Sequence, residues 1–150
     1  MDLVIDVERY PSFIPAMTAL RKTRDLPDGF EAEAVISYKA IRETFASRVT
    51  FDREKRQIRA EKTQRGGPVK SLKNRWAFYE LSNGSTFVDF SVDVRLVFPL
   101  EALLSQKFED AKTLIKDVFI QQARDHCELI EGDIDIYAEA RALRFDNRLI

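Results

Sequence analysis

Apolar and polar residues alternate with a period of two over much of the first hundred residues, which is the pattern of half-buried β-strands. The clearest run occupies positions 88–98, with one face formed by Val88, Phe90, Val92, Val94, Leu96 and Phe98. Weaker runs predict further strands at 17–26, 30–38, 44–51, 57–64 and 72–78. A hairpin turn is predicted at Ser82-Asn83-Gly84-Ser85. Strands with one apolar and one polar face are typical of an antiparallel sheet.

The period becomes helical after Pro99, a residue that suits the first turn of a helix. A single apolar stripe then predicts a long helix from Leu100 to about Cys127, formed by Leu104, Phe108, Ala111, Ile115, Val118, Phe119 and Gln122. Only the apolar face of the sheet can bury this stripe, so the pattern predicts an α+β fold with the helix on one face. A cavity remains between helix and sheet wherever the facing side chains do not fill the space.

The two ends of the chain are less regular. Residues 1–8 predict a short helix that ends before Pro11, because proline disfavours the helical conformation in the residue before it. The tail, 128–150, allows a short helix through its apolar residues, but the sequence GDIDIY could equally extend as a strand. We therefore expect one folded unit over 1–127 and a separate tail over 128–150, in part helical or without fixed structure.

Composition limits the classes of function. The chain has 150 residues, enough for one domain with a real core. A net charge of −1 argues against non-specific DNA binding by overall charge. A single cysteine allows no internal disulfide, and one cysteine with one histidine argues against a structural zinc site. The N-terminal sequence lacks a signal-peptide pattern, so we expect a cytoplasmic protein, with peripheral contact at the inner membrane as an open alternative.

Four stretches in the same order resemble a known family. They are DVERYPSFIP, YKAIRETFASRVTFD, GGPVKSLKNRWAF and VDFSVDVRLVFPLEALL. Together they resemble the coenzyme Q-binding START-like (polyketide cyclase/dehydrase-like) proteins, a family that includes bacterial ribosome-association toxins. The resemblance covers roughly residues 2–127. It implies a helix-grip (START/Bet v 1-like) fold, in which a curved antiparallel sheet wraps around a long C-terminal helix and leaves a hydrophobic tunnel between them.

The chain departs from the family at both ends. Family members usually begin with a strand before the first helix, whereas this chain opens inside that helix, at MDLVIDVERYP. The absent first strand would lie at the seam of the sheet, and its loss would leave an unpaired edge. The tail extends beyond the usual end of the family. We expect an N-terminally incomplete helix-grip domain over 1–127.

The resemblance implies that the tunnel binds ubiquinone or a related polyisoprenoid lipid, in support of respiratory electron transport or quinone biosynthesis. It implies no reaction, no catalytic residue, no metal and no cofactor other than the lipid ligand. The residues expected to line the tunnel or cap its mouth are Tyr10, Phe13, Ile14, Phe45, Ser47, Asn74, Trp76, Phe78, Phe90, Leu104, Phe108 and Ile115. For the aromatic residues, ordinary core packing is the alternative.

Ser47 and Asn74 stand out because each lies between apolar residues of one strand face. A buried polar group without a partner costs about 1–3 kcal/mol, so each side chain must bond something. Either they bond a ligand carbonyl or an ordered water in the pocket, or they bond neighbouring backbone. The second is the more common arrangement in proteins, and the sequence favours it.

Two other functions compete with lipid binding. A ribosome-binding protein that blocks subunit joining would follow from the toxin members of the family and from a basic cluster at Arg65, Lys70, Lys73 and Arg75. Those residues could also contact anionic lipid headgroups, or form a charged loop that keeps a sheet edge soluble. An enzyme of the cyclase or aromatase type ranks last, because the sequence shows no convincing acid–base pair facing the predicted cavity.

Overall fold

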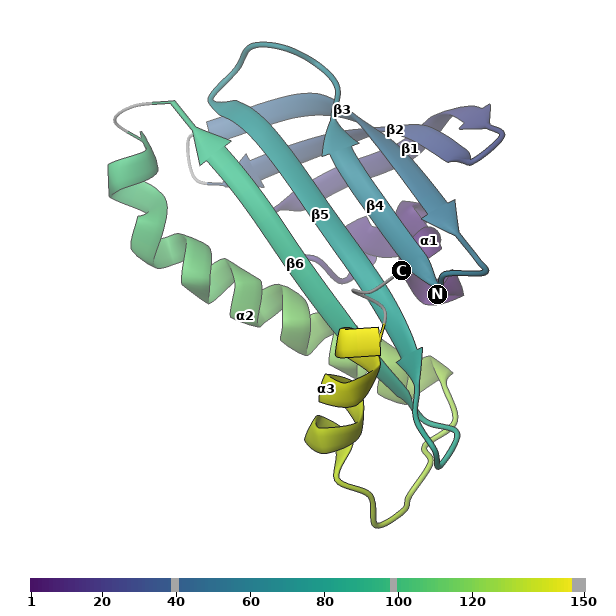
Figure 1. The fold of residues 1–150 in the computed structure, drawn as a ribbon. Helices are drawn as coiled ribbons and strands as arrows, with labels where there is room; N and C mark the ends of the chain where they lie inside the picture. Colours follow the sequence, from purple (N-terminus) through teal and green to yellow (C-terminus); the bar gives the residue numbers. More distant parts are fainter. Residues whose placement is uncertain (39–40, 98–99, 147–150) are drawn as a thin grey trace.

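A six-stranded antiparallel sheet dominates the structure, which is a computed structural model (Figure 1). It describes residues 1–38, 41–97 and 100–146, without the side chains of residues 38, 41, 100–109 and 144–146. The strands pair in chain order, each with the next. Their bounds are β1 Met17–Leu26, β2 Gly29–Tyr38, β3 Ile41–Asp52, β4 Gln57–Lys62, β5 Val69–Glu80 and β6 Thr86–Leu96.

Tight turns fix the register of neighbouring strands. In the turn between β5 and β6, the Asn83 side-chain oxygen accepts hydrogen bonds from the backbone N–H and the hydroxyl of Ser85, at 3.0 and 2.6 Å. Gly84 has φ +82°, a conformation that costs glycine little. The hairpin pairs Trp76 with Phe90, so the apolar faces of both strands point the same way.

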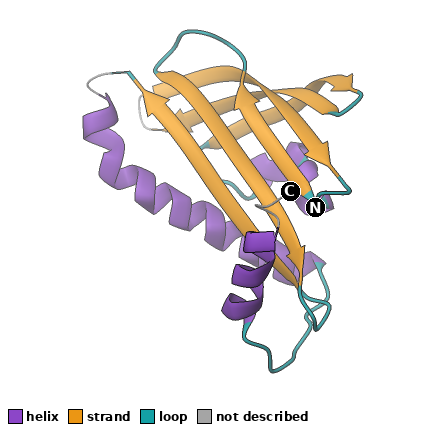
Figure 2. Ribbon diagram, in the orientation of Figure 1, coloured by secondary structure: helices purple, strands orange, loops and turns teal. Residues whose placement is uncertain are grey.

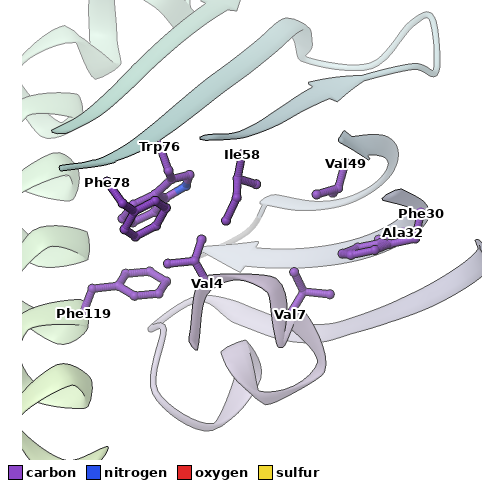
Figure 3. Close-up of a cluster of buried hydrophobic side chains, with 9 residues drawn as sticks. All are labelled: Val4, Val7, Phe30, Ala32, Val49, Ile58, Trp76, Phe78 and Phe119. Atoms are coloured by element: carbon purple, nitrogen blue, oxygen red, sulfur yellow. The ribbon is translucent and has the colours of Figure 1, made fainter. Parts of the chain in front are cut away.

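Three helical elements lie on the concave face of the sheet: α1 (Asp2–Ile5), the 3-10 helix η1 (Val7–Ser12) and α2 (Leu100–His126). Val4 and Val7 point from the first two elements toward the sheet, and Phe119 points toward it from α2 (Figure 3). They meet a buried layer of sheet residues, formed by Phe30, Ala32, Val49, Ile58, Trp76 and Phe78. We call these nine residues the core cluster. Full burial of an aliphatic or aromatic side chain contributes about 1.5–3 kcal/mol, so this cluster is the main source of stability.

Helix α3 (Ile136–Asp146) lies against the opposite, outer face of the sheet, in front of β5 and β6 in Figure 1. Ala77 and Tyr79 alternate with the inward-facing residues of β5, yet both are buried. Ala140 of α3 is also buried, and Glu139 accepts hydrogen bonds from the backbone N–H and the hydroxyl of Ser82. The tail therefore covers the outer face at one end of β5, and both faces of the strand are buried there.

The predicted fold class is confirmed: a curved antiparallel sheet and a long C-terminal helix form an α+β helix-grip (Figure 2). The predicted strand 57–64 is shorter, because it ends at Lys62 and the chain then turns toward two glycines. Near the N-terminus, the helical turn does not stop before Pro11 but continues through it as a 3-10 helix. The expected role of Pro99 lies outside the described residues. Within the described residues, β1 and β6 are the two edges of the sheet.

Candidate ligand-binding site

The concave face of the sheet has two unlike ends. At the closed end, the core cluster joins the sheet to α1, η1 and α2. Toward the other end, four apolar side chains face the same way but are only half-buried and lie outside the core cluster: Leu72, Val92, Val94 and Leu96. We call this second region the open half. It runs along β5 and β6 and continues across the register onto β4 and β3.

Ring contacts fill the closed end. The Tyr10 ring lies 5.3 Å from the Phe119 ring, the Phe13 ring lies 5.5 Å from it, and the Trp76 ring lies 4.9 Å from it. The Tyr10 hydroxyl donates a hydrogen bond to the Val4 carbonyl at 2.5 Å. Burial raises the pKa of this hydroxyl above its ordinary value, helped by the negative charge of Asp6, so it stays a neutral donor.

Ser47 and Asn74 provide polar atoms to the open half. Ser47 lies opposite Lys62 on β4, and Asn74 lies opposite Ala60 on β4 and Val92 on β6. Both side chains are half-buried, and no hydrogen bond is recorded for either of them within the described residues. Among the described residues, no side-chain nitrogen or oxygen is both buried and without a hydrogen-bond partner. Their polar atoms therefore reach accessible space, and the expected bonds to neighbouring backbone are not formed.

A buried ion pair, which the sequence did not predict, closes one end of the open half. The Lys62 side chain is only 2 % exposed and the Glu43 side chain 11 %, with Nζ 3.3 Å from Oε1. Lys62 also donates to the carbonyls of Gly66 and Val69, at 2.8 and 2.5 Å. Strand alternation from Ile58 places Lys62 on the concave face, so extending the period by two more residues could have found it.

The loop 63–68 folds onto this ion pair. Gly66 and Gly67 have φ +89° and +79°, conformations that are strained for other residues. A Cβ atom at Gly67 would stand 2.6 Å from the Glu43 Oε1 atom and 3.8 Å from the Lys62 Nζ atom. Only glycine lets the backbone approach the carboxylate so closely. The glycines that the sequence marks as a break thus bring the loop against the two charges.

The structure describes the side chains of ten of the twelve predicted site residues, and they are spread over both ends of the concave face. Seven lie in or against the core cluster at the closed end: Tyr10, Phe13, Ile14, Trp76, Phe78, Phe90 and Ile115. Phe45 is buried between Glu43 and Ser47 on the concave face of β3. Ser47 and Asn74 face the open half. The side chains of Leu104 and Phe108 lie outside the described residues.

The outer face carries a different depression, of about 330 Å³, over β4, β5 and β6. Its lining carries both signs of charge, through Arg59, Glu61, Lys73, Arg75 and Asp93, and also includes Ser91. Asn74 and Val92, whose side chains alternate onto the concave face, border it between those residues. Two members of the predicted basic cluster are paired there: Lys73 with Glu61 at 3.8 Å, and Arg75 with Asp89 at 3.9 Å. The paired charges of this surface do not suit a polyanion.

No group of three or more His, Cys, Asp or Glu residues is arranged to hold a metal ion in the part of the chain that the structure describes. Among the described helices, none is both long enough and apolar enough to cross a membrane. The open half of the concave face therefore remains the best candidate for binding.

The fold defines a class, the START-like helix-grip proteins, in which a curved antiparallel sheet packs against a long C-terminal helix. The family model described as "Polyketide cyclase / dehydrase and lipid transport" matches residues 1–114. Because this match spans more than half of the sequence, the chain belongs to that family.

Individual relatives agree with this assignment. The ribosome association toxin RatA of Escherichia coli strain K12 is 26% identical over 124 residues, which covers 82% of this chain and 77% of the relative. The 18 kDa protein CC1736 of Caulobacter crescentus is 32% identical with a TM-score of 0.58, covering 83% of this chain and 86% of its own. A START superfamily protein of Mycobacterium smegmatis shares the fold, with a TM-score of 0.61 at 18% identity, covering 81% and 87%.

Proposed function

We propose that this chain binds ubiquinone or a related polyisoprenoid lipid in the open half of its concave face, and thereby supports respiratory electron transport or quinone biosynthesis. One observation carries the proposal. A row of half-buried apolar side chains lies beside two polar side chains that have no recorded protein partner among the described residues. The family description, which includes lipid transport, supports it.

The chemistry of the face divides between affinity and orientation. Apolar side chains such as Leu72, Val92 and Val94 would cover the isoprenoid tail, at about 25 cal/mol for each Å² of apolar surface removed from water. Part of that gain is lost to ordering the flexible tail. Ser47 and Asn74 would hydrogen-bond the oxygen atoms of the head. This division is usual in pockets for small molecules.

The proposal includes binding without a reaction. Glu43 and Lys62 do form an acid–base pair on the concave face, contrary to the expectation from sequence. However, the three N–H groups of Lys62 meet three acceptors, Glu43, Gly66 and Val69. A lysine in this arrangement has no proton donor left for a substrate. A ligand recovered after long incubation should therefore have an unchanged mass, and a new product would contradict this part of the proposal.

Lipid binding can be tested directly by extracting the purified protein with organic solvent and identifying the extract by mass spectrometry. Added ubiquinone with a short tail should also bind and quench the fluorescence of Trp76, the only tryptophan. Val94→Asp places a charge in the open half and should abolish both signals. Ser91→Asp places the same charge on the outer face of the same strand and should leave them unchanged.

Two outcomes would count against the proposal. A protein that neither carries a lipid nor binds added ubiquinone does not have the proposed function. Equal losses in Val94→Asp and Ser91→Asp would show that charge on β6 acts through stability and not through the open half.

The relatives favour a second candidate, a protein that associates with ribosomes and blocks subunit joining. The supporting observation is the 26% identity to a ribosome association toxin over 82% of the chain. Carboxylates pair with Lys73 and Arg75, which weakens the expected basic surface for RNA. Sucrose-gradient profiles of cells that overproduce the chain decide the matter, since an unchanged fraction of joined ribosomes would exclude this activity.

A further inference from the structure

The hydrogen-bonding atoms at the Glu43 end of the open half do not suit every ligand head group equally. Resting on the lipid-binding function proposed above, we propose that the site prefers an amphiphile whose head carries hydroxyl groups, such as a hydroquinone, over the corresponding quinone. The preference depends on which hydrogen-bonding atoms of Lys62 and Glu43 remain available to a ligand.

Lys62 offers nothing to a ligand. Its ammonium group has three N–H donors, and Glu43 Oε1, the Gly66 carbonyl and the Val69 carbonyl accept from them at 3.3, 2.8 and 2.5 Å. Only 2 % of the Lys62 side chain is exposed. Lysine is a pure donor, and this one is saturated. A quinone carbonyl thus finds no free donor on Lys62.

Glu43 keeps one oxygen available. The recorded contacts of its carboxylate involve Oε1, and no other interaction is recorded for the residue within the described chain. No side-chain oxygen there is both buried and unpaired, so Oε2 reaches accessible space. The ion pair to Lys62 and the packing of Gly67 against Oε1 hold the group in place. Because strand alternation places Glu43 on the same concave face as Phe45 and Ser47, Oε2 is the acceptor that this residue offers to a ligand there.

A carboxylate oxygen only accepts hydrogen bonds. A hydroquinone or phenol hydroxyl can donate a hydrogen bond to it. A quinone oxygen is itself only an acceptor, so it forms no hydrogen bond with the carboxylate and is repelled by it. Ser47 can donate or accept, and so can the Asn74 amide, so neither distinguishes the two forms. Phe45 lies between Glu43 and Ser47 on the same face of β3, but it is buried, offers a ligand little surface and so distinguishes neither form.

The test compares two redox forms of one probe. Decyl-substituted ubiquinone and its hydroquinone, kept reduced under anaerobic conditions, are each titrated into the full chain and followed by calorimetry. Because a hydrogen bond to a charged group is strong, we expect the hydroquinone to bind at least about tenfold more tightly than the quinone. Ser47→Ala should weaken both forms by a similar factor, because its hydroxyl serves either one.

Glu43→Gln alone would leave Lys62 buried without its carboxylate, so the fold itself could suffer. The double variant Glu43→Gln with Lys62→Met removes both charges and keeps similar volumes, a replacement that proteins often tolerate. In this variant the two redox forms should bind within about twofold of each other, since a glutamine amide both donates and accepts. Circular dichroism confirms that the fold is retained.

The outcomes separate this inference from the function on which it rests. Equal binding of both forms to the natural chain, or tighter binding of the quinone, overturns the head-group preference and leaves lipid binding intact. Binding of neither form overturns both. A preference that survives in the double variant assigns the selection to other residues and also overturns the inference. The comparison on the natural chain is decisive even if the double variant does not fold.

Discussion

Replacing Lys62 by methionine should destabilise the protein strongly, because it leaves a charged Glu43 side chain that is only 11 % exposed. Removing one partner of a buried ion pair typically costs about 3–5 kcal/mol. Glu43→Gln should cost less, about 1.5–3 kcal/mol, because Lys62 keeps two backbone carbonyls as acceptors. The double variant should lose less than the sum of the two single variants, with a coupling of about 0.5–3 kcal/mol.

Urea denaturation followed by the fluorescence of Trp76 measures these free energies, since this residue is buried in the core cluster. Lys73→Met is the matched control. It breaks an ion pair with Glu61 that joins β5 to β4, as the pair of Lys62 with Glu43 joins β4 to β3, at 3.8 Å, but with side chains 63 % and 58 % exposed. Exposed pairs contribute about 0–1 kcal/mol and weaken further with added salt.

Burial is the main difference between the two pairs, together with the two backbone carbonyls that also accept hydrogen bonds from Lys62. If Lys62→Met and Lys73→Met lower the free energy of unfolding equally, the structural placement of Lys62 is wrong. The same conclusion follows if 0.5 M salt abolishes the effect of Lys62→Met, because a buried charge is poorly screened.

Three further predictions follow from the core and the tail. Phe119→Ala should cost about 3–5 kcal/mol in urea denaturation, whereas Ile120→Ala, at a neighbouring position that is 43 % exposed, should cost far less, and equal costs would contradict the core described here. Hydrogen bonds from the Ser82 hydroxyl and backbone lower the pKa of Glu139, so the attachment of α3 is fully present above the ordinary pKa and is lost as pH falls through the lowered one. An NMR titration of the Ser82 amide should show this release in acid, and an amide signal that does not respond would exclude it. Gly29→Ala should cost about 1–3 kcal/mol by thermal unfolding, because its Cβ would overlap a backbone carbonyl of β3, and an unchanged melting temperature would refute that contact.

The positions of the strands and of the long helix could be predicted from the periodicity of the sequence. Alternation places Trp76 and Leu72 on one face of β5, and the structure has both there. The change of period after Pro99 predicted a helix from Leu100, and α2 begins at that residue and ends at His126. These features are local, because a period of two or of 3.6 residues follows from backbone geometry alone.

The candidate site was less predictable for a physical reason. Periodicity says which face a side chain occupies, but not what covers that face. Trp76 and Leu72 have the same pattern, yet Trp76 joins the core cluster while Leu72 is only half-buried, since α1, η1 and Phe119 cover one end of the sheet. Tyr10 and Phe13, expected near a cavity mouth, instead pack in that closed end.

Sequence by itself determined the fold class of this protein, the order of its strands and helices, and the inward direction of Ser47 and Asn74. Tertiary structure alone decided that those two side chains have no backbone partner among the described residues and that a loop folds back over Lys62 and Glu43. Glu43 and Lys62 lie on different strands, and the two glycines that permit their burial lie in a loop beyond β4. Contacts between such distant residues depend on how the whole sheet curves and pairs, which no local pattern records.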